Sequence, residues 1–481
     1  MTNPANPVLV GIDVGTTGVK VIGLDPRSGV IVASDTREYE TRTRSDGTHE
    51  QDPAAWWGAV CAGTRSVVEQ LSGRRVQAVG LSGHMHSLLL VDGDDTPVLP
   101  ALTWADRRSG EETARLASDP RFRLTGGNDV VGAFTAPKLA WAATTHPAEV
   151  DRAHRLVLTK DYIGHLLTGV WATDETDALG TLLYDFRAQR WSPELFAAVG
   201  ASPRLGQPVL RSTDERGLVH AQAAAATGLP AGIPVMAGAG DVSASVVGAG
   251  VVDGSRMVLN VGTAAQVMGV AHTPDPGPGF LFGSATGSGF VTMASLYAAG
   301  ASVRWAERAL FGGADINAVA AGGEAGSDGL TYLPFMFGST VPRKNDAARA
   351  AFLGQTEQHG PAQLAGAVLE GIAFACADAI DAVAHVTGRP DAVRLVGGVT
   401  RSERWRQALA SVVDARLELV PDGGSALGAA VLAGIGAGVY GSDADAADAI
   451  ATVPVSRPAE GDADRYRAAR DRYRAWCDRL L

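Results

Sequence analysis

The feature that most constrains the fold is a repeated pattern in which two strand-like segments flank a Gly-Thr turn. It occurs at residues 11–25 (GIDVGTTGVKVIGLD) and again at residues 257–270 (MVLNVGTAAQVMGV). Aligning the glycines of the two turns, Gly15 and Gly262, also aligns the threonine that follows each of them. Apolar runs on both sides of a short glycine-containing turn are typical of antiparallel strand pairs. The repetition indicates two lobes built on a similar plan.

The residues around the first turn predict an α/β lobe. Three strand-like segments lie within residues 8–40, and a helical pattern follows at residues 52–73. Asp52 is placed to cap this helix and Gly73 to end it. A further apolar strand is expected at residues 76–83. Strands followed by a helix and another strand are typical of an α/β layer structure.

The second half repeats this order. Residues 361–388 have apolar residues at helical spacing and end in Gly388, and a strand is expected within residues 392–400 before another helix. A chain of 481 residues is too long for one hydrophobic core. We therefore expect two lobes, residues 1–249 and residues 250–481.

Composition limits the classes of partner. The net charge of −11 disfavours non-specific binding to nucleic acid. We find no apolar run long enough to cross a membrane and no signal peptide at the amino terminus. Three isolated cysteines (Cys61, Cys376 and Cys477) suggest neither disulfides nor a zinc site. These features predict a cytoplasmic protein that binds neither nucleic acid nor membranes.

The first Gly-Thr turn has a carboxylate before it, Asp13, and an amine after it, Lys20. Backbone N–H groups and hydroxyls in such a turn form a small concavity that suits phosphate oxygens. The residues that can supply them are Gly15, Thr16 and Thr17. Lys20 adds positive charge, and Asp13 can hold Mg²⁺ through water. The alternative is an ordinary hairpin turn, but a second turn at Gly262–Thr263 favours two lobes that bind one nucleotide.

Asp241 lies in a run of small residues, GAGDVSAS, close to the expected lobe boundary. A carboxylate in such a loop can act as a general base toward a substrate hydroxyl. The same residue can also cap a helix that starts there. The two roles are compatible.

Two further segments contain residues that suit a polar ligand. His84 and His86 are two positions apart, but no third ligand completes a zinc site, so polar recognition or packing is expected instead. Trp104 and Asp106 suit a sugar, with an apolar face and a hydroxyl acceptor; the alternative is a salt bridge between Asp106 and Arg108.

Gly397 and Gly398 lie between an expected strand and an expected helix. Backbone without side chains allows a flat ring or a phosphate to approach closely at such a place. A single glycine pair is a weak indication of a site.

The chain resembles the FGGY family of carbohydrate kinases almost from end to end, and within it the members that act on D-xylulose. Ten segments occur in the family's order: GIDVGTTGVK, EQDPAAWW, SGHMHSLLLVD, GAFTAPKLAW, TKDYIGHLLTG, TDETDALGTLLYD, GAGDVSASVVGAG, NVGTAAQV, HGPAQLAGAVLEG and RSERWRQALA. The resemblance implies an actin-like fold of two ribonuclease-H-like lobes around a central cleft. It also implies transfer of the γ-phosphate of ATP to a sugar hydroxyl with Mg²⁺.

By matched position, the resemblance implies a role for each candidate residue. Asp241 would be the base that deprotonates the hydroxyl, and Asp13 would orient the metal ion. The sugar would contact His84, Met85, His86, Trp104 and Asp106. Phosphates would be held at Gly262 and Thr263, with adenosine beside Gly397 and Gly398.

The chain departs from the family pattern at several of these places. His84 replaces a glutamine, Ala105 an asparagine, and Val242 an asparagine that follows the catalytic aspartate. Elsewhere, Ser339 and Thr340 replace a charged pair, and Val399 replaces a third glycine. The expected substrate is D-xylulose, with another ketopentose or polyol (ribulose, arabitol or erythritol type) as an alternative. A non-catalytic, sugar-sensing actin-like ATPase is the alternative class, and a homodimer is left open.

Overall fold

The computed structural model of the chain describes residues 7–275, 279–287 and 289–481. It divides into two compact units. The first comprises Met1–Val252, Phe282–Phe290 and Asp422–Ala451; the second comprises Asp253–Leu281, Val291–Pro421 and Thr452–Leu481. A seven-stranded sheet forms in each half of the sequence, with helices packed against it, which confirms the predicted class of two α/β lobes. Residues 282–290 and 422–451 belong to the first unit, although a linear division at residue 249 places them in the second lobe.

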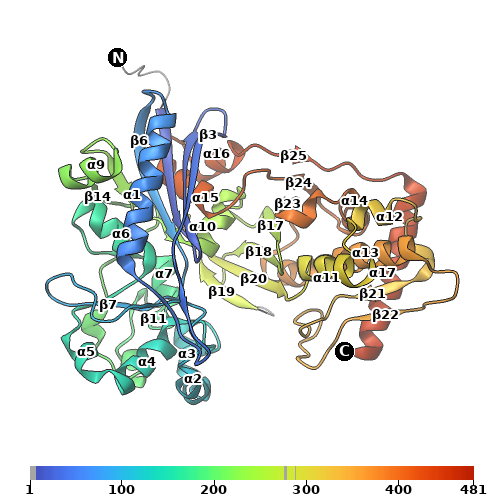
Figure 1. The fold of residues 1–481 in the computed structure, drawn as a ribbon, viewed down its shortest axis with the longest axis horizontal. Helices are drawn as coiled ribbons and strands as arrows, with labels where there is room; N and C mark the ends of the chain where they lie inside the picture. The colour runs from blue at the N-terminus through green and yellow to red at the C-terminus, as the bar shows by residue number, and fades with distance from the viewer. Residues whose placement is uncertain (1–6, 276–278, 288) are drawn as a thin grey trace. The chain divides into compact units, whose positions relative to one another are not determined.

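The sheet of the first unit has the order β14-β15-β6-β1-β2-β3, and the short strand β16 also pairs with β6. Figure 1 labels β3, β6 and β14 of this sheet. Its strands are β1 (Pro7–Val14), β2 (Gly18–Asp25), β3 (Val30–Glu38), β6 (Arg75–Gly83), β14 (Glu215–Leu218), β15 (Pro234–Met236) and β16 (Ala239–Gly240). β1 runs antiparallel to β2, with Asp13 opposite Lys20, and parallel to β6. The three predicted strands and the further strand expected at residues 76–83 are confirmed.

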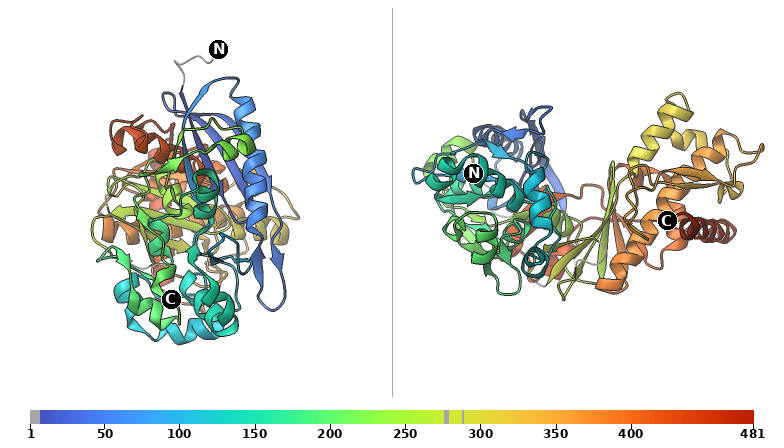
Figure 2. Two further views of the ribbon diagram at one scale, coloured as in Figure 1. Left: turned by 90° about the vertical axis from the view of Figure 1, so that its left-hand side faces the viewer. Right: turned by 90° about the horizontal axis from the view of Figure 1, so that it is seen from below.

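Both faces of this sheet are covered by helices because the residues of β1 alternate between them. On one face lies α1 (Pro53–Gln70), the long blue helix beside the sheet in Figure 2. This helix contributes Trp56 to the core. On the other face lies α15 (Ser425–Gly436). Gly11 makes this close approach possible, since a Cβ there would lie 2.0 Å from the carbonyl oxygen of Ala426.

Helix α1 begins as the sequence predicts. The Asp52 carboxylate accepts a hydrogen bond of 2.9 Å from the Ala54 N–H, and Pro53 occupies the first turn. The helix ends at Gln70, before Gly73, whose φ of +83° reverses the chain.

The remaining elements of the first unit are shorter. Its further helices are α2 (Gly110–Ala117), α3 (Pro120–Gly126), α4 (Thr135–Thr145), α5 (Pro147–Arg152), α6 (Thr159–Thr168), α7 (Glu175–Gly180), α8 (Pro193–Ala198), η1 (Pro203–Leu205), α9 (Ala221–Thr227), α10 (Asp241–Gly248) and α16 (Asp443–Asp448). Its further strands are β4 (Arg42–Thr43), β5 (His49–Gln51), β7 (Leu89–Val91), β8 (Ala101–Leu102), β9 (Arg155–Val157), β10 (Thr173–Asp174), β11 (Tyr184–Asp185), β12 (Arg190–Trp191) and β13 (Val209–Leu210).

The sheet in the second half of the sequence has the order β19-β20-β18-β17-β23-β24-β25. Its strands are β17 (Arg256–Val261), β18 (Ala265–Ala271), β19 (Phe280–Gly283), β20 (Phe290–Leu296), β23 (Ala392–Val396), β24 (Arg416–Leu419) and β25 (Val453–Pro454). β17 is antiparallel to β18 across the Gly-Thr turn and parallel to β23. This repeats the relation of β1 to β2 and β6, so the predicted duplication is confirmed.

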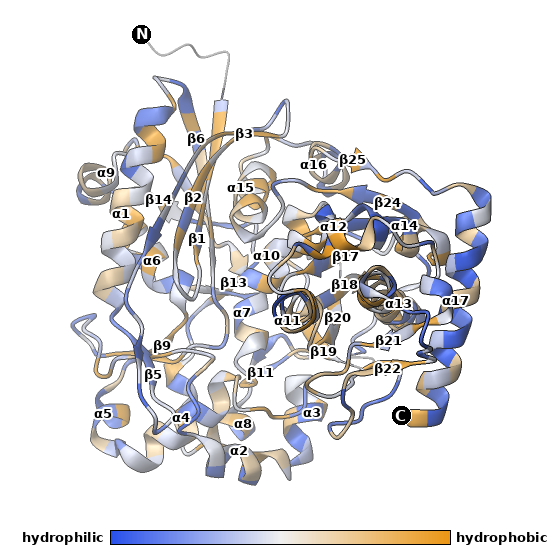
Figure 3. Cartoon of the chain, turned by 45° about the vertical axis from the view of Figure 1, so that its right-hand side comes forward, coloured by the Kyte–Doolittle hydropathy of each residue, from blue (hydrophilic) through white to orange (hydrophobic). Residues whose placement is uncertain are grey.

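The long helix α13 (Pro361–Thr387) forms the centre of the second unit's core. α17 (Glu460–Leu480) carries mostly hydrophilic residues (Figure 3) and buries only a stripe that includes Tyr466 and Tyr473. The other elements are α11 (Gly300–Leu310), α12 (Ile316–Ala320), η2 (Ser327–Gly329), β21 (Thr331–Leu333), β22 (Ala351–Leu353), η3 (Gly398–Arg401) and α14 (Glu403–Val412). Within the described residues, no helix combines the length and hydrophobicity needed to cross a membrane.

Candidate active site

Asp13 lies at the end of β1, beside the first Gly-Thr turn. Its Oδ2 accepts a hydrogen bond of 2.6 Å from the Ser425 hydroxyl, which comes from the start of α15. Its Oδ1 is buried and has no hydrogen-bond partner among the described residues. Burial raises the pKa of Asp13, opposed by the hydroxyls of Ser425 and Ser82 and by the charge of Lys20. A buried carboxylate oxygen without a partner suits a cation or its bound water.

Side chains from other elements fix the backbone of this turn. The Gly15 N–H donates to the Gly18 carbonyl over 2.9 Å, and the Gly15 carbonyl accepts from the Tyr39 hydroxyl. The Thr16 carbonyl accepts a hydrogen bond of 2.7 Å from the Gln51 side chain. Sequence reasoning missed the roles of Tyr39 and Gln51; Gln51 lies in the segment EQDPAAWW, but nothing in that segment indicates a contact with the turn.

Trp104 is joined to the same turn. Its indole N–H donates to the Thr16 hydroxyl over 2.9 Å, and 39% of the residue remains exposed. Thr17 and Lys20 are exposed, so their side chains are available to a ligand. The structure therefore brings Asp13, the turn and Trp104 together.

Asp241 is the first residue of α10, and Gly240 occupies the N-cap position. Its Oδ1 accepts a hydrogen bond of 2.8 Å from the adjacent Val242 N–H, but Asp241 is not the N-cap residue and no described side chain caps α10, so the capping alternative is wrong. Burial raises the pKa of Asp241 to about 7, and the negative charge of Asp13 acts in the same direction. Backbone N–H groups of Val242 and Met85 oppose these effects. Asp13, Met85 and Asp241 thus influence one another electrostatically.

His84 and His86 follow β6 but have different surroundings. His84 is buried against the Trp56 ring, with centroids 5.6 Å apart, and its Nδ1 lies 2.8 Å from the Ser87 hydroxyl. His86 is half-buried, and its Nδ1 lies 2.7 Å from the Gly180 carbonyl oxygen, so Nδ1 carries the proton. Burial lowers the pKa of His84 to about 3 and that of His86 to about 4. Both rings are therefore neutral at pH 7.

Asp106 is fully buried. The Arg108 guanidinium contacts both of its oxygens, at 2.7 Å for the shortest distance, and the His49 N–H donates to Oδ2 over 2.9 Å. The salt-bridge alternative for this residue is thus present in the structure. A direct contact between Asp106 and a sugar stays a prediction.

The second unit has its own candidate site around the second Gly-Thr turn. The carbonyls of Gly262 and Thr263 accept hydrogen bonds of 3.0 Å from the first residues of α11. Arg304, one turn into that helix, donates to the Thr263 hydroxyl over 3.0 Å. Sequence reasoning missed Arg304. It lies one turn after the start of a helix, and this position could have indicated a contact with the second Gly-Thr turn. A pocket of about 490 Å³ is lined here by Val261, Gly262, Thr263, Gly300, Val303, Arg304, Glu307, Asp315, Ile316, Asn317, Leu369, Gly398, Val399, Arg401 and Ser402.

Gly397 follows β23 as the N-cap residue of η3, and Gly398 is the first residue of η3. Gly397 has a φ of +101°, and a Cβ there would lie 2.5 Å from the Val261 carbonyl oxygen. Gly398 lines the pocket, and a Cβ there would have open space around it. The structure therefore brings both glycines to the Gly262–Thr263 turn.

The carboxylates of the first unit can hold Mg²⁺ only if water and substrate phosphates supply its other ligands. No cluster of three or more His, Cys, Asp or Glu side chains within the described ranges could hold a metal ion. Mg²⁺, however, commonly takes one or two carboxylates and completes its shell with water and substrate phosphates. Asp13, with its unpartnered Oδ1, fits that requirement.

Comparisons with known proteins agree with this division into two parts. Profiles of the N-terminal and C-terminal domains of the FGGY family of carbohydrate kinases match residues 8–248 and 257–437. Xylulose kinase of Escherichia coli K12 is 34% identical over 96% of each chain. A solved xylulose kinase structure from Rhodospirillum rubrum has a TM-score of 0.89 at 27% identity, covering 98% of this chain and 99% of that one. A gluconate kinase structure from Lactobacillus acidophilus has the same TM-score at 25% identity, covering 99% and 98%.

Proposed function

This chain belongs to the FGGY family of carbohydrate kinases, and from that premise we propose that it transfers the γ-phosphate of ATP to D-xylulose, giving D-xylulose 5-phosphate. The choice of sugar is supported by the xylulose kinases that are similar over nearly the whole chain. The observation that carries the chemistry is Asp241, a half-buried carboxyl whose pKa of about 7 suits a general base.

Asp241 takes the proton from the attacking sugar hydroxyl in this proposal. Asp241 must be ionised to accept this proton. Its pKa of about 7 means that a substantial fraction of the carboxyl is ionised at neutral pH. Asp13 would hold Mg²⁺, which would supply positive charge against the phosphates of ATP. A cation at Asp13 would offset the negative charge that raises the pKa of Asp241, and would so favour the ionised form of that carboxyl.

Three residues contact the sugar. The exposed face of Trp104 packs against its carbon skeleton. His86 is neutral and donates through Nδ1 to Gly180, so its Nε2 accepts a hydrogen bond from a sugar hydroxyl. Met85 lies beside Asp241, where the reacting hydroxyl must sit.

The nucleotide binds to the pocket of the second unit. The Gly262–Thr263 turn and the guanidinium of Arg304 hold phosphate oxygens, and the side-chain-free backbone at Gly397–Gly398 allows the adenosine to approach. Phosphoryl transfer depends mainly on positioning and charge stabilisation, which these groups supply.

A coupled assay of ADP release tests the proposal. Mg-ATP is presented with D-xylulose, L-xylulose, D- and L-ribulose, arabitol, erythritol, glycerol and gluconate in parallel. We expect D-xylulose to give the highest kcat/KM. If another sugar gives the highest kcat/KM, we would attribute the changed specificity to His84, Ala105 and Val242. Stimulation by none of them, together with sugar binding in calorimetry, would support the non-catalytic, sugar-sensing alternative.

A further inference from the structure

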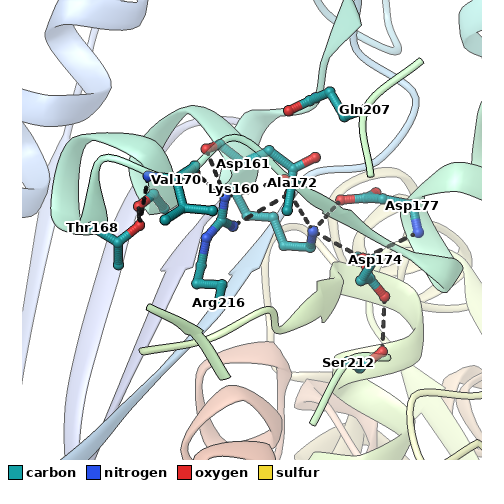
Figure 4. Close-up of polar contacts among 12 residues, drawn as sticks. Lys160, Asp161, Thr168, Val170, Ala172, Asp174, Asp177, Gln207, Ser212 and Arg216 are labelled. Atoms are coloured by element: carbon teal, nitrogen blue, oxygen red, sulfur yellow. Dashed lines mark hydrogen bonds and ion pairs between the residues drawn. The ribbon is translucent and has the colours of Figure 1, made fainter. Parts of the chain in front are cut away.

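A group of fully buried charged side chains lies in the first unit and has no assigned role (Figure 4). The Lys160 amine lies within ion-pair distance of three carboxylates: Asp161 (2.6 Å), Asp174 (2.9 Å) and Asp177 (3.2 Å). Burying an ammonium group is costly unless such partners surround it. Lys160 therefore holds these three carboxylates in place through ion pairs.

Asp174 connects Lys160 to the short helix α7. It is the N-cap residue, and its carboxylate accepts from the N–H groups of Thr176 (2.9 Å) and Asp177 (3.3 Å). The same carboxylate accepts from the hydroxyls of Thr176 (2.7 Å) and Ser212 (2.8 Å). The start of α7 is thus held in place by charge-assisted hydrogen bonds.

Helix α7 contacts the candidate site at both of its ends. At its start, the Thr176 hydroxyl accepts a hydrogen bond of 2.9 Å from the N–H of Gly240, the residue directly before Asp241. At its end, the Gly180 carbonyl oxygen lies 2.7 Å from Nδ1 of His86.

Met85 fills the space between these two contacts. A Cβ on Gly180 would lie 2.8 Å from the Met85 Cε, and a Cβ on Gly240 would lie 2.5 Å from its Cγ. The backbone at both glycines therefore packs directly on Met85, which in turn donates its N–H toward Asp241.

The Thr176 hydroxyl has one proton, and that proton is committed to Asp174. Its lone pairs are consequently directed to the Gly240 N–H, which fixes the backbone at the residue from which Asp241 projects. A chain of contacts then runs from Lys160 through Asp174 and Thr176 to Gly240.

We propose that Thr176 is a positioning residue, which holds the backbone before Asp241 so that its carboxylate meets the sugar hydroxyl in the orientation needed for proton transfer. The inference rests on the proposed function of Asp241 as the base. Positioning of this kind is expected to affect kcat more than substrate binding, because it matters most in the transition state.

The test compares Thr176→Val, which removes the hydroxyl at nearly constant volume, with Thr176→Ser, which keeps it. Thr181→Val is the matched control. Thr181 is also buried and follows α7, but its hydroxyl donates to the Ala178 carbonyl (2.6 Å) and accepts from the Leu183 N–H (3.0 Å), away from Gly240. For each variant, kcat, the KM values for sugar and ATP, and Tm are measured.

We expect Thr176→Val to lower kcat by about 10- to 100-fold, because small misplacements of a reacting group cost this much. Its KM for ATP should stay within about twofold of wild type, and Thr176→Ser should recover most of kcat. Thr181→Val should lower Tm while kcat stays close to wild type. If Thr176→Val does not fold, Thr176→Cys, whose sulfur is a weak acceptor of similar size, should show a smaller loss of kcat in the same direction.

Wild-type kcat in Thr176→Val, or an equal fall in Thr181→Val, overturns the inference and leaves the proposed function intact. Wild-type protein that releases no ADP with any sugar overturns the proposed function, and the inference with it.

Discussion

Asp241 shows how groups far away in the sequence set the proton affinity of one side chain. Burial and the charge of Asp13 raise its pKa to about 7, while the N–H groups of Val242 and Met85 oppose that rise. Asp13 is the last residue but one of β1 and Asp241 begins α10, so only the fold brings their charges within range of each other.

Replacing Asp241 by asparagine should remove the base without changing the shape of the site. We expect Asp241→Asn to lower kcat by at least about 100-fold, the range typical of a lost general base, while ATP binding is retained. ADP release and calorimetric titration with ATP measure the two effects. Asp443→Asn is the matched control, because Asp443 is also a half-buried first residue of a helix, α16. Turnover near wild type in Asp241→Asn would contradict the assignment.

The same substitution predicts a pH-dependent change in stability. Asp241 has a pKa of about 7 in the folded chain and an ordinary value of 3.8 when unfolded. The unfolded chain therefore loses this proton at a lower pH than the folded chain does. As a result, the free energy of unfolding falls as pH rises from about 4 to about 7. Asparagine does not titrate, so Asp241→Asn should raise Tm by a few degrees more at pH 8 than at pH 5. Differential scanning calorimetry without nucleotide measures this, and an equal change at both pH values would argue against it.

At the scale of single elements, much of the fold could be predicted because the signals are local. Alternating apolar residues and glycine turns marked β1, β2, β17 and β18, and Asp52 with Pro53 marked the start of α1. These elements depend on their own residues and immediate neighbours.

The side-chain partners in the site could not be predicted in the same way. Thr176 and Gly240 are separated by 64 residues, and nothing in either segment indicates that they meet. Asp106 accepts hydrogen bonds from the N–H of His49, in β5, and from Arg108; the sequence suggested Arg108 as a partner but not His49. Such contacts depend on how elements pack, which periodicity does not reveal.

The glycine turn after β23 allows a test at the element scale. Gly397→Ala would place a Cβ 2.5 Å from the Val261 carbonyl oxygen and strain a φ of +101°, so the turn must move away from Gly262. We expect ATP affinity to fall by about tenfold, since small displacements in a site have effects of this size. Gly388→Ala is the control, because Gly388 also has a positive φ (+87°) but open space around it. Equal ATP affinity in both variants, measured by titration, would show that the turn does not shape the nucleotide site.

At the scale of the whole molecule, the first unit is assembled from three separate segments of the chain. Its helix α15 is apolar on every side and lies against β1 and β6. Gly11 and Gly80 permit this contact, since a Cβ on either would lie within 2.0 Å of a carbonyl oxygen of α15. The sequence did not lead us to predict α15, and its apolar composition alone does not indicate which of the two sheets it covers.

A fragment that ends at Val252 should therefore not fold properly. Without α15, one face of β1 and β6 is exposed, and we expect residues 1–252 to aggregate or to unfold without a cooperative transition. Joining residues 422–451 to this fragment through a flexible linker should restore a cooperative thermal transition by circular dichroism. Cooperative unfolding of residues 1–252 alone would show that α15 is dispensable.

The late return of α15 also has a consequence for biosynthesis. Translation proceeds at about 5 to 20 residues per second, so roughly 10 to 40 s pass between synthesis of Val252 and of Ala451, the last residue of the first unit. During most of that interval one apolar face of the nascent amino-terminal sheet is exposed, because α15 has not yet been made. The order of segments along the chain, rather than the stability of the finished protein, therefore sets how long that apolar face stays uncovered during synthesis.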